Sequence, residues 1–240
     1  MNKLSAMTWR EAARLSDRPT LLLVPFGSTE QHGPHLPLST DTDIAGALAS
    51  AAADRLGNAM IAPAVAYGAS GEHQGFPGTI SIGQAATELV VVELGRSASA
   101  DFAGIVVVST HGGNTGPVER AVTTLRHEGR NVWAWGPRWD GDAHAGRTET
   151  SLMLAIAPDR VHLDVAEPGD TRPISELLPR LRADGVRSVS TSGVLGDPTG
   201  AGADEGRLLL AAAVDDLVAF AQGHRARAHL GPTAGMTGVR

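Results

Sequence analysis

The chain has 240 residues, 42% of them hydrophobic and 19% charged, which is enough to bury one sizeable core but favours a single domain over two. The net charge is -6 and no long basic run occurs, so neither a nucleic acid nor an anionic membrane surface is an expected partner. Cysteine is absent, which excludes disulfides, thiolate metal sites and a cysteine nucleophile. Any metal must therefore be held by nitrogen and oxygen.

In chain order, short aliphatic or β-branched runs alternate with longer, alanine-rich amphipathic segments. The expected elements are a helix at 8–15, a strand at 21–26, a helix at 43–57, strands at 59–65 and 103–110, a helix at 116–127, a strand at 132–135, and helices at 148–157 and 204–221. This alternation predicts one three-layer α/β/α sandwich with a mostly parallel central sheet. We expect the domain to span residues 1–223 and a mobile tail to follow at 224–240.

Membrane and export signals are not evident in the sequence. The first twenty residues, MNKLSAMTWREAARLSDRPT, lack an apolar stretch of signal-peptide length. No run approaches the roughly 20 apolar residues that a membrane helix needs. The expectation is a cytoplasmic protein without a membrane partner that acts on small molecules or peptides.

Acids and imidazoles are concentrated in PFGSTEQHGPHLPLSTDTD, residues 25–43, among turn-forming glycines and prolines. Glu30 and His32 are two residues apart, so in extended backbone their side chains leave the same side and can reach one ion. Asp41 directly precedes the predicted helix, and for this residue alone a role as helix N-cap is the better hypothesis. Ligand-type residues in the other loops make a metal-binding role for Asp41 more plausible than capping.

Two predicted strands end in loops with ligand-type side chains. Residues 21–26 run out into the loop with Glu30 and His32, and residues 103–110 run out into HGGN, which begins with His111. Ligands of α/β folds gather outside the carboxyl ends of strands, so these three side chains are expected at one edge of the sheet.

A further loop, DAHAGRTETS, follows the strand at 132–135 and contributes His144 and Glu149. Each residue has a structural alternative: a histidine at a strand end is often simply hydrogen-bonded, and Glu149 could stabilise the first turn of its helix through the macrodipole. Several such residues at one sheet edge nevertheless favour a metal site.

Carboxylates and histidines without a thiol suit a divalent first-row metal such as zinc, iron(II) or manganese. Five candidate ligands are enough for two ions per subunit, with Asp41 as the candidate bridge between them. Such metals lower the pKa of a bound water from 15.7 to roughly 7, which supplies a nucleophile at neutral pH. Hydrolysis is therefore the expected reaction.

Other residues are weaker candidates for the same pocket. His35 is expected to support or line it, and His73, in GEHQGFPGT, could equally serve its own loop. Trp139 lies beyond the strand at 132–135 and could form an apolar wall of the site, whereas Trp133 is expected in the core. Signatures of serine hydrolases, nucleotide hydrolases and dinucleotide-binding proteins do not occur, although HGGNTG before a helix could bind an anion.

Five motifs together resemble the creatininase family of metal-dependent amidohydrolases. They are GSTEQHGPHLPLSTDTD, GFPGTISI, THGGN, HAGRTETS and GDPTGA, and the resemblance runs from about residue 20 to residue 223. It implies the three-layer fold, a closed homo-oligomer and a dinuclear centre. The matching positions are Glu30, His32, Asp41 and His111, with Asp41 as the bridge.

The resemblance also implies roles for residues beyond these four. Creatininase itself has a carboxylate two residues after the HGGN-type histidine, and Gly113 stands there in this chain, which argues against creatinine as substrate. The resemblance to family members that carry HGGN implies that Glu149 is the remaining metal ligand. His144 matches the family histidine that handles protons, so the implied mechanism is amide hydrolysis with His144 donating a proton to the leaving amine.

Within the family, STHGGNTGP together with DAHAGRTETSLML is most similar to a peptidase branch that trims a modified precursor peptide. That similarity implies release of a C-terminal Val-Tyr dipeptide. One alternative is a small-molecule amidohydrolase for a cyclic amide or a formylamino compound, as in deazaflavin and riboflavin biosynthesis. A second is a non-catalytic, metal-stabilised scaffold.

Overall fold

Four parallel strands form the centre of the protein in the computed structural model, which describes residues 2–17 and 19–229. The strands are β1 (Leu21–Phe26), β2 (Ala59–Ile61), β3 (Gly104–Ser109) and β4 (Val132–Trp135), in the spatial order β2-β1-β3-β4. β1 pairs with β3 along its whole length, from Leu21 opposite Gly104 to Phe26 opposite Ser109. The loops that follow β1 and β3 therefore leave the sheet side by side.

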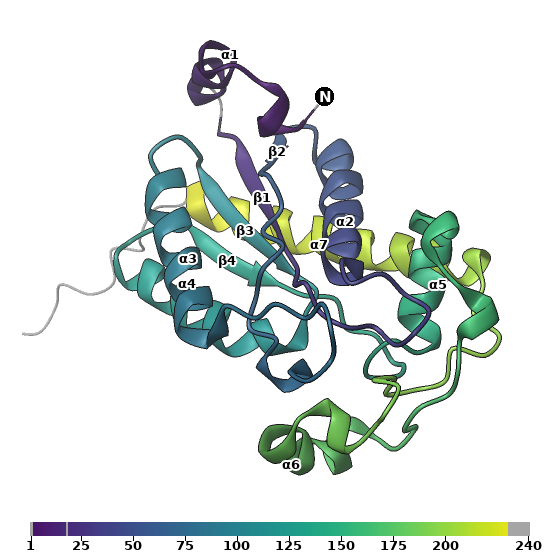
Figure 1. Cartoon of the computed structure of the whole chain (residues 1–240). Coiled ribbons are helices and arrows are strands. Elements are labelled where there is room, and N and C mark those ends of the chain that lie inside the picture. The colour runs from purple at the N-terminus through teal and green to yellow at the C-terminus, as the bar shows by residue number, and fades with distance from the viewer. Residues whose placement is uncertain (1, 18, 230–240) are drawn as a thin grey trace, which may run out of the picture.

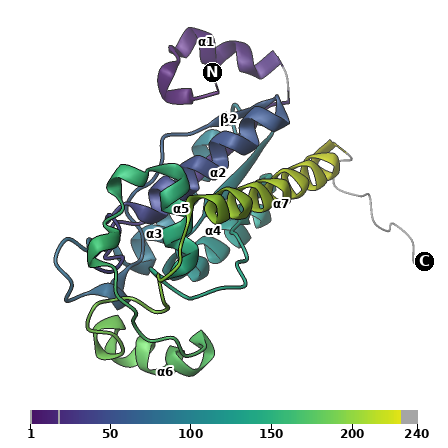
Figure 2. The same ribbon diagram turned by 90° about the vertical axis from the view of Figure 1, so that its right-hand side faces the viewer.

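Helices cover both faces of this sheet (Figures 1 and 2). The helices are α1 (Trp9–Ala13), α2 (Thr40–Leu56), α3 (Gly83–Ala98), α4 (Thr115–His127), α5 (Arg147–Ile156), α6 (Ile174–Asp184) and α7 (Ala203–His229). The alternation of β1 decides which side chain meets which layer: Leu21 and Leu23 join the cluster with α2, α5 and α7, while Leu22 and Phe26 face the clusters that include α3 and α4. The predicted three-layer α/β/α sandwich is confirmed.

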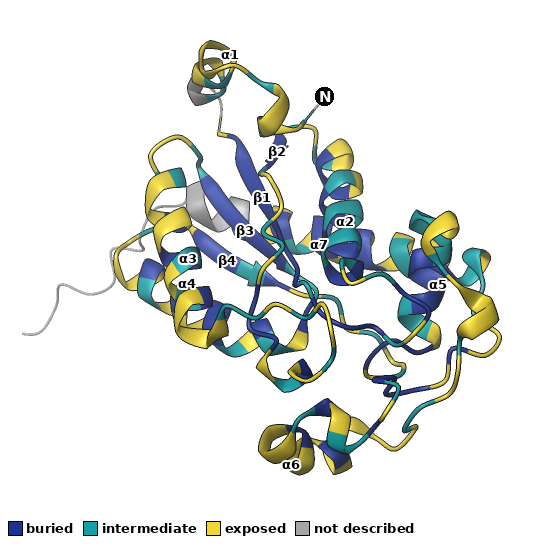
Figure 3. Cartoon of the chain, in the orientation of Figure 1, coloured by how far each residue is buried: buried dark blue, intermediate teal, exposed yellow. Residues whose placement is uncertain are grey.

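Burial follows the same division (Figure 3). All six residues of β1 are buried, as expected for a strand covered on both faces, whereas the helices expose their outer sides. Trp133 is buried in the core as predicted. None of the helices within the described part of the chain is long and apolar enough to cross a membrane.

Several element boundaries differ from the prediction. α2 begins at Thr40, ahead of the expected residue 43, and β2 ends at Ile61, after which only Val65 makes an isolated bridge to Phe26. α3 and α6 were not predicted; α6 contains Pro179 and buries only Leu177 and Leu181, so its pattern is weak. The capping box of α1 is present, with Thr8 and Glu11 bonded reciprocally.

The last helix is longer than the sequence indicated. α7 continues to His229, so residues 224–229, which we expected to begin a mobile tail, are helical. The remainder of that predicted tail, residues 230–240, lies outside the described part of the chain.

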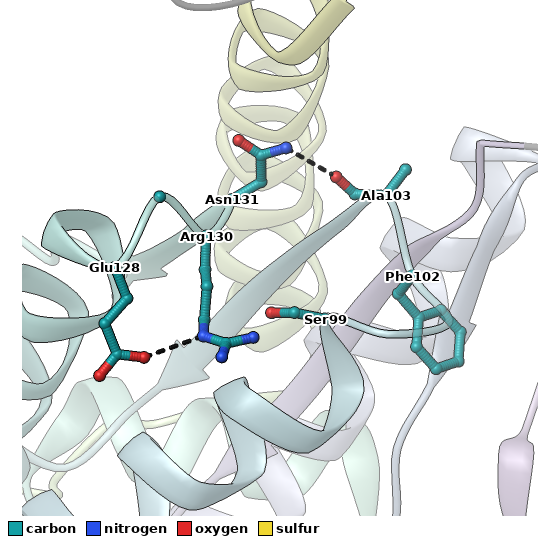
Figure 4. A pocket seen from close by; sticks show the side chains of 7 residues that line it. Ser99, Phe102, Ala103, Glu128, Arg130 and Asn131 are labelled. Carbon is teal, nitrogen blue, oxygen red and sulfur yellow. Dashed lines mark hydrogen bonds and ion pairs between the residues drawn. The ribbon is translucent and has the colours of Figure 1, made fainter.

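Two peripheral features frame the sheet at opposite edges. α6 lies beyond the carboxyl edge of the strands, at the end of the molecule away from α1, and packs through a small apolar cluster that includes Phe76 and Leu195 (Figures 1 and 2). At the amino edge, where β3 and β4 begin, an open cavity of about 290 Å³ is lined by residues including Phe102, Glu128 and Arg130 (Figure 4). Glu128 is ion-paired to both Arg96 and Arg130 there, so the charges of that cavity are already matched.

Candidate metal centre at the carboxyl edge of the sheet

Side chains from six segments converge at the carboxyl edge of the strands. They come from the loop after β1, the start of α2, the 71–73 turn, the loops after β3 and β4, and the start of α5. They form three overlapping groups, and within each group the ligand-type atoms lie within 4.8 Å of one another. The groups are Glu30–Asp41–His111, His32–His144–Glu149 and Glu30–His73–His144. The structure thus brings together all six residues that the sequence singled out as ligands or as the proton-handling residue.

One half of the cluster is centred on His111. Its Nδ1 lies 3.1 Å from Glu30 Oε1 and 3.6 Å from Asp41 Oδ2. Glu30 is fully buried, and His111 is 6% exposed. One imidazole nitrogen and two carboxylates therefore surround a point from which bulk water is excluded.

The other half is centred on His32. Its Nε2 lies 3.4 Å from Asp41 Oδ1 and 3.8 Å from Glu149 Oε2. Asp41 thus directs one oxygen to each half of the cluster, which is the arrangement a bridging carboxylate needs. The side chain of Glu149 is partly exposed (20%), so solvent reaches this half from that side.

The capping role considered for Asp41 is wrong. Asp41 lies inside the first turn of α2, and Ser39 occupies the N-cap position without a side-chain capping bond. The Asp41 carboxylate instead accepts a hydrogen bond of 2.6 Å from the buried hydroxyl of Ser28, while its main-chain oxygen accepts one from the Thr110 hydroxyl. These contacts from the loops after β1 and β3 hold the carboxylate toward the two histidines.

Each central histidine is anchored through one ring nitrogen to a backbone carbonyl. His32 Nδ1 lies 3.2 Å from the oxygen of Glu30, and His111 Nε2 lies 3.1 Å from that of Ala69. His144 Nε2 lies 2.8 Å from the oxygen of Gln31. A carbonyl only accepts, so in each ring the anchored nitrogen carries hydrogen and the opposite nitrogen is directed into the cluster.

Glu149 is positioned by an unusual turn before α5. Ala145 has φ of 52°, the only positive φ at a non-glycine position among the described residues, and its N–H donates to Glu149 Oε2 at 2.6 Å. Asp142 caps the helix by accepting from the backbone N–H groups of Arg147 and Thr148. Glu149 therefore both stabilises the helix start and reaches His32, so the two roles considered for it do not exclude one another.

The buried carboxylates hold two of the histidines in the charged form. Burial opposes charge on His32, but Asp41 and Glu149 outweigh it and raise its pKa to about 10. Burial likewise opposes charge on His111, and Glu30, Asp41 and Glu72 raise its pKa to about 10. Glu30 is desolvated, yet His111 and its neighbours hold the pKa of Glu30 well below its usual range.

His73, His144 and Glu149 have pKa values shifted toward the neutral form. Burial lowers the pKa of His73 to about 4, and burial together with the neighbouring charge of His32 lowers the pKa of His144 well below its usual value. Burial also raises the pKa of Glu149 to about 7. The cluster therefore combines two cationic imidazoles with two neutral ones in a single dry site.

The polar atoms of this cluster fit a cationic occupant. Both oxygens of Glu30 and Nε2 of His32 are buried without a well-aligned hydrogen-bond partner in the described part of the chain. Buried polar atoms are normally paired, and an unpaired carboxylate is especially costly. Nitrogen and oxygen donors in these groups are those that zinc, iron(II) and manganese accept.

Glu72 belongs to the cluster but was missed by the sequence analysis. Its Oε1 lies 3.6 Å from His111 Nε2, and its side chain is 32% exposed. A Cβ at Gly113 would lie 2.5 Å from the same Oε1 and 2.2 Å from the Ala69 oxygen, so position 113 admits no side chain here. A carboxylate from the 71–73 turn thus occupies the space beside Gly113. Nothing in the local sequence pattern of GEHQG indicates that Glu72 lies close to His111 and Gly113.

The weaker candidates have different placements. His73 is within the cluster, with Nε2 3.5 Å from Glu30 Oε1. His35 is buried, and its Nε2 pairs with the Thr150 hydroxyl at 2.9 Å; its role at the site stays a prediction. Trp139 packs partly buried against the main core cluster. Asn114 of HGGN bonds to the backbone of Gly27 and Ala69, so its side chain joins two loops of the site.

The fold and the clustered side chains define an α/β protein with a candidate metal centre at the carboxyl edge of its sheet. The profile of the Creatininase family, described as creatinine amidohydrolase, matches residues 5–221. The chain belongs to this family, as its motifs predicted.

Individual relatives agree with this assignment. The chain is 54% identical over 202 residues to the mycofactocin precursor peptide peptidase of Mycolicibacterium smegmatis, covering 81% of each protein. It is 29% identical over 246 residues to the creatinine amidohydrolase of Pseudomonas putida, covering 88% of this chain and 92% of that enzyme. Among solved structures, a creatinine amidohydrolase matches with a TM-score of 0.79 and 26% identity over 97% of this chain and 99% of that one.

Metal uptake is expected to release protons. At pH 7 the metal-free protein holds His32 and His111 charged, because both have a pKa of about 10, and binding ions at both must displace about two protons. Apparent affinity should therefore rise with pH up to about 10. Calorimetric titration with zinc in buffers of different ionisation enthalpy measures the number released; a heat independent of buffer would contradict the assignment.

The same charges affect the metal-free fold. Because the folded pKa lies above the ordinary value of 6.5, the stabilisation is complete below pH 6.5 and is lost as pH rises through about 10. Chemical denaturation of chelated protein across this range should show the loss, and zinc-loaded protein is the control because zinc would replace the second proton on each of these two rings.

Glu149→Gln is expected to weaken metal binding in the His32 half of the cluster only. The amide keeps the shape but loses the negative charge that faces His32 Nε2 at 3.8 Å. Elemental analysis after dialysis should find about one ion per subunit fewer than in the wild type, with a loss of roughly 10- to 100-fold in affinity. Full metal content with wild-type affinity would place Glu149 outside the ligand set.

Proposed function

We propose that this protein is a dinuclear metal-dependent peptidase that releases the C-terminal Val-Tyr dipeptide from a modified mycofactocin precursor peptide. The observation that carries the proposal is the 54% identity to a mycofactocin precursor peptide peptidase over 81% of both chains. Two further proteins of that name, from Mycobacterium ulcerans and Mycobacterium tuberculosis, are 51% and 49% identical. The clustered carboxylates and histidines supply chemistry for cleaving an amide bond.

The ligand set of the proposal follows the two halves of the cluster. Glu30, Asp41 and His111 would hold one ion, and His32, Asp41 and Glu149 the other, with Asp41 shared. When bound, the ions would polarise the scissile carbonyl and lower the pKa of the attacking water. Solved neighbours described as creatininase Mn and as a Zn-Zn type creatininase mutant support a choice among such divalent ions.

His144 is the proton carrier in this mechanism. It is held neutral by burial, and its Nδ1 faces Glu30 Oε1 at 3.9 Å. A neutral imidazole first accepts the proton that the attacking water loses as the new C–O bond forms. It then donates that proton to the leaving nitrogen as the C–N bond breaks, so the free amine departs and the ring returns to its starting state.

Substrate access is expected across the partly exposed carboxylates. Glu149 and Glu72 have side chains 20% and 32% exposed, whereas Glu30 and His32 are fully buried. The scissile bond would therefore approach from this side. Trp139 as an apolar wall, a closed homo-oligomer and a cytoplasmic location stay predictions that accompany this function.

The assignment is tested with zinc-, iron(II)- or manganese-loaded protein and the modified precursor peptide. Mass spectrometry should show the peptide losing Val-Tyr, and chelated protein should leave it intact. Asp41→Ala is the matched negative control, because loss of the shared carboxylate should remove both ions. An intact peptide with two ions bound would contradict the peptidase and turn the search to cyclic or formylated amides, assayed in parallel.

His144→Ala is expected to keep both ions and lose turnover by roughly 10²- to 10⁴-fold, because it removes the proton carrier and none of the proposed ligands. Elemental analysis and the peptide assay on the same preparation separate these effects. If His144→Ala loses one ion, His144 is a metal ligand, a role that its position beside His32 and Glu149 also permits. If the variant keeps full turnover, His144 takes no part in the mechanism.

A further inference from the structure

Gln31 lies in the chain between Glu30 and His32, but its side chain has a different environment. It is 5% exposed and lies against the neighbouring rings of His73 and His144, whose centroids are 4.5 Å apart. Its carboxamide touches both rings and two backbone groups. The orientation of that amide decides what His73 presents to the candidate metal centre, and the main-chain carbonyl of the same residue decides what His144 presents.

The amide orientation is fixed by backbone contacts. The N–H of Gly33 donates to Gln31 Oε1 at 2.9 Å, which identifies that atom as the oxygen. The NH₂ group on the other side lies 3.1 Å from the carbonyl oxygen of Gly193 and 2.8 Å from His73 Nδ1. A Cβ at Gly193 would come within 1.8 Å of Oε1, so the amide fits only because position 193 is glycine.

This orientation assigns the proton of His73. Both hydrogens of the Gln31 amide are used by the Gly193 oxygen and by His73 Nδ1, which must therefore accept. The neutral ring then carries its hydrogen on Nε2. That nitrogen faces Glu30 Oε1 at 3.5 Å, so His73 presents a donor to the buried carboxylate.

The main chain of the same residue assigns the proton of His144. Its Nε2 lies 2.8 Å from the Gln31 carbonyl oxygen and 3.0 Å from the Gln31 amide nitrogen. The carbonyl can only accept, and the amide hydrogens already have partners, so Nε2 of His144 is the donor. Its bare Nδ1 is left facing Glu30 Oε1 at 3.9 Å.

We propose that Gln31 is the positioning residue of the reaction: its amide makes His73 present an N–H to Glu30, and its carbonyl makes His144 present a lone pair to the same centre. The inference rests on the proposed function and deepens it, since a proton carrier must begin with a free acceptor. His73 is thereby the fixed donor, and His144 the ring that exchanges a proton with substrate.

The first test reads the protonated nitrogens directly and needs no substrate. Zinc-loaded, full-length protein with ¹⁵N-labelled histidine is examined by long-range ¹H–¹⁵N correlation, with His73→Ala and His144→Ala used for assignment. Both rings should be neutral with the proton on Nε2. A proton on Nδ1 of either ring in the wild type overturns the proposal, whether or not the peptide is cleaved.

Gln31→Glu removes the donor while keeping the shape. His73 Nδ1 should then take up a proton to face the new carboxylate, whereas His144 should be unchanged because its partner is a backbone carbonyl. We expect kcat to fall roughly 10- to 100-fold with KM within about threefold and with zinc content unchanged. Gln74→Glu, at an exposed position beside His73, adds the same charge and should behave as wild type.

Failure of the Gln31 proposal can be distinguished from failure of the proposed peptidase function. If another amide substrate replaces the peptide, the histidine spectra still decide the proposal, and the same variants are measured on that substrate. Wild-type spectra or wild-type kcat in Gln31→Glu would overturn it. If that variant does not fold, Gln31→Met is measured instead, because it removes the amide without adding charge. In this variant His73 should no longer prefer its proton on Nε2, and kcat should again be reduced.

Discussion

Buried negative charge is the constraint on which the rest of the structure depends. Glu30 and Asp41 are withdrawn from water, and Glu149 nearly so, at one edge of a small sheet. Desolvated carboxylates are stable only beside positive charge. In the metal-free protein the charged rings of His32 and His111 provide part of it. Divalent ions would provide more, which is why these donors suit a metal centre better than a structural ion-pair network.

The surrounding fold is arranged to keep this charge cluster in place. The parallel pairing of β1 with β3 delivers two ligand-bearing loops side by side, and Asn114 ties those loops to the 68–69 segment. Backbone carbonyls orient three of the rings, the Ser28 hydroxyl orients Asp41, and a strained turn at Ala145 delivers Glu149. Most of these supports lie on loops, so their precision comes from hydrogen bonding and from the rigid sheet beneath.

Family membership and site geometry answer different questions. Residues 5–221 match the creatininase profile, and a solved creatinine amidohydrolase shares the fold. At the margin of the cluster this chain has Gly113, and the carboxylate of Glu72 approaches that position from the 71–73 turn. Glu72 is partly exposed, so this margin is accessible to solvent. The peptidase relatives, at about half identity, are a better guide to function than the more distant creatinine amidohydrolase.

The sequence by itself determined the layered fold and indicated most of the candidate ligands, because both depend on local pattern: strand-like runs, their alternation with helices, and polar residues where strands end. The position of Glu30, His32 and His111 directly after two predicted strands placed them at one edge of the sheet. Only the tertiary structure decided that Asp41 lies inside its helix and faces both histidines, that Glu72 fills the space beside Gly113, and that Gln31 connects two rings. These features join segments far apart in the chain, and their hydrogen bonds and close approaches exist only once the loops are packed.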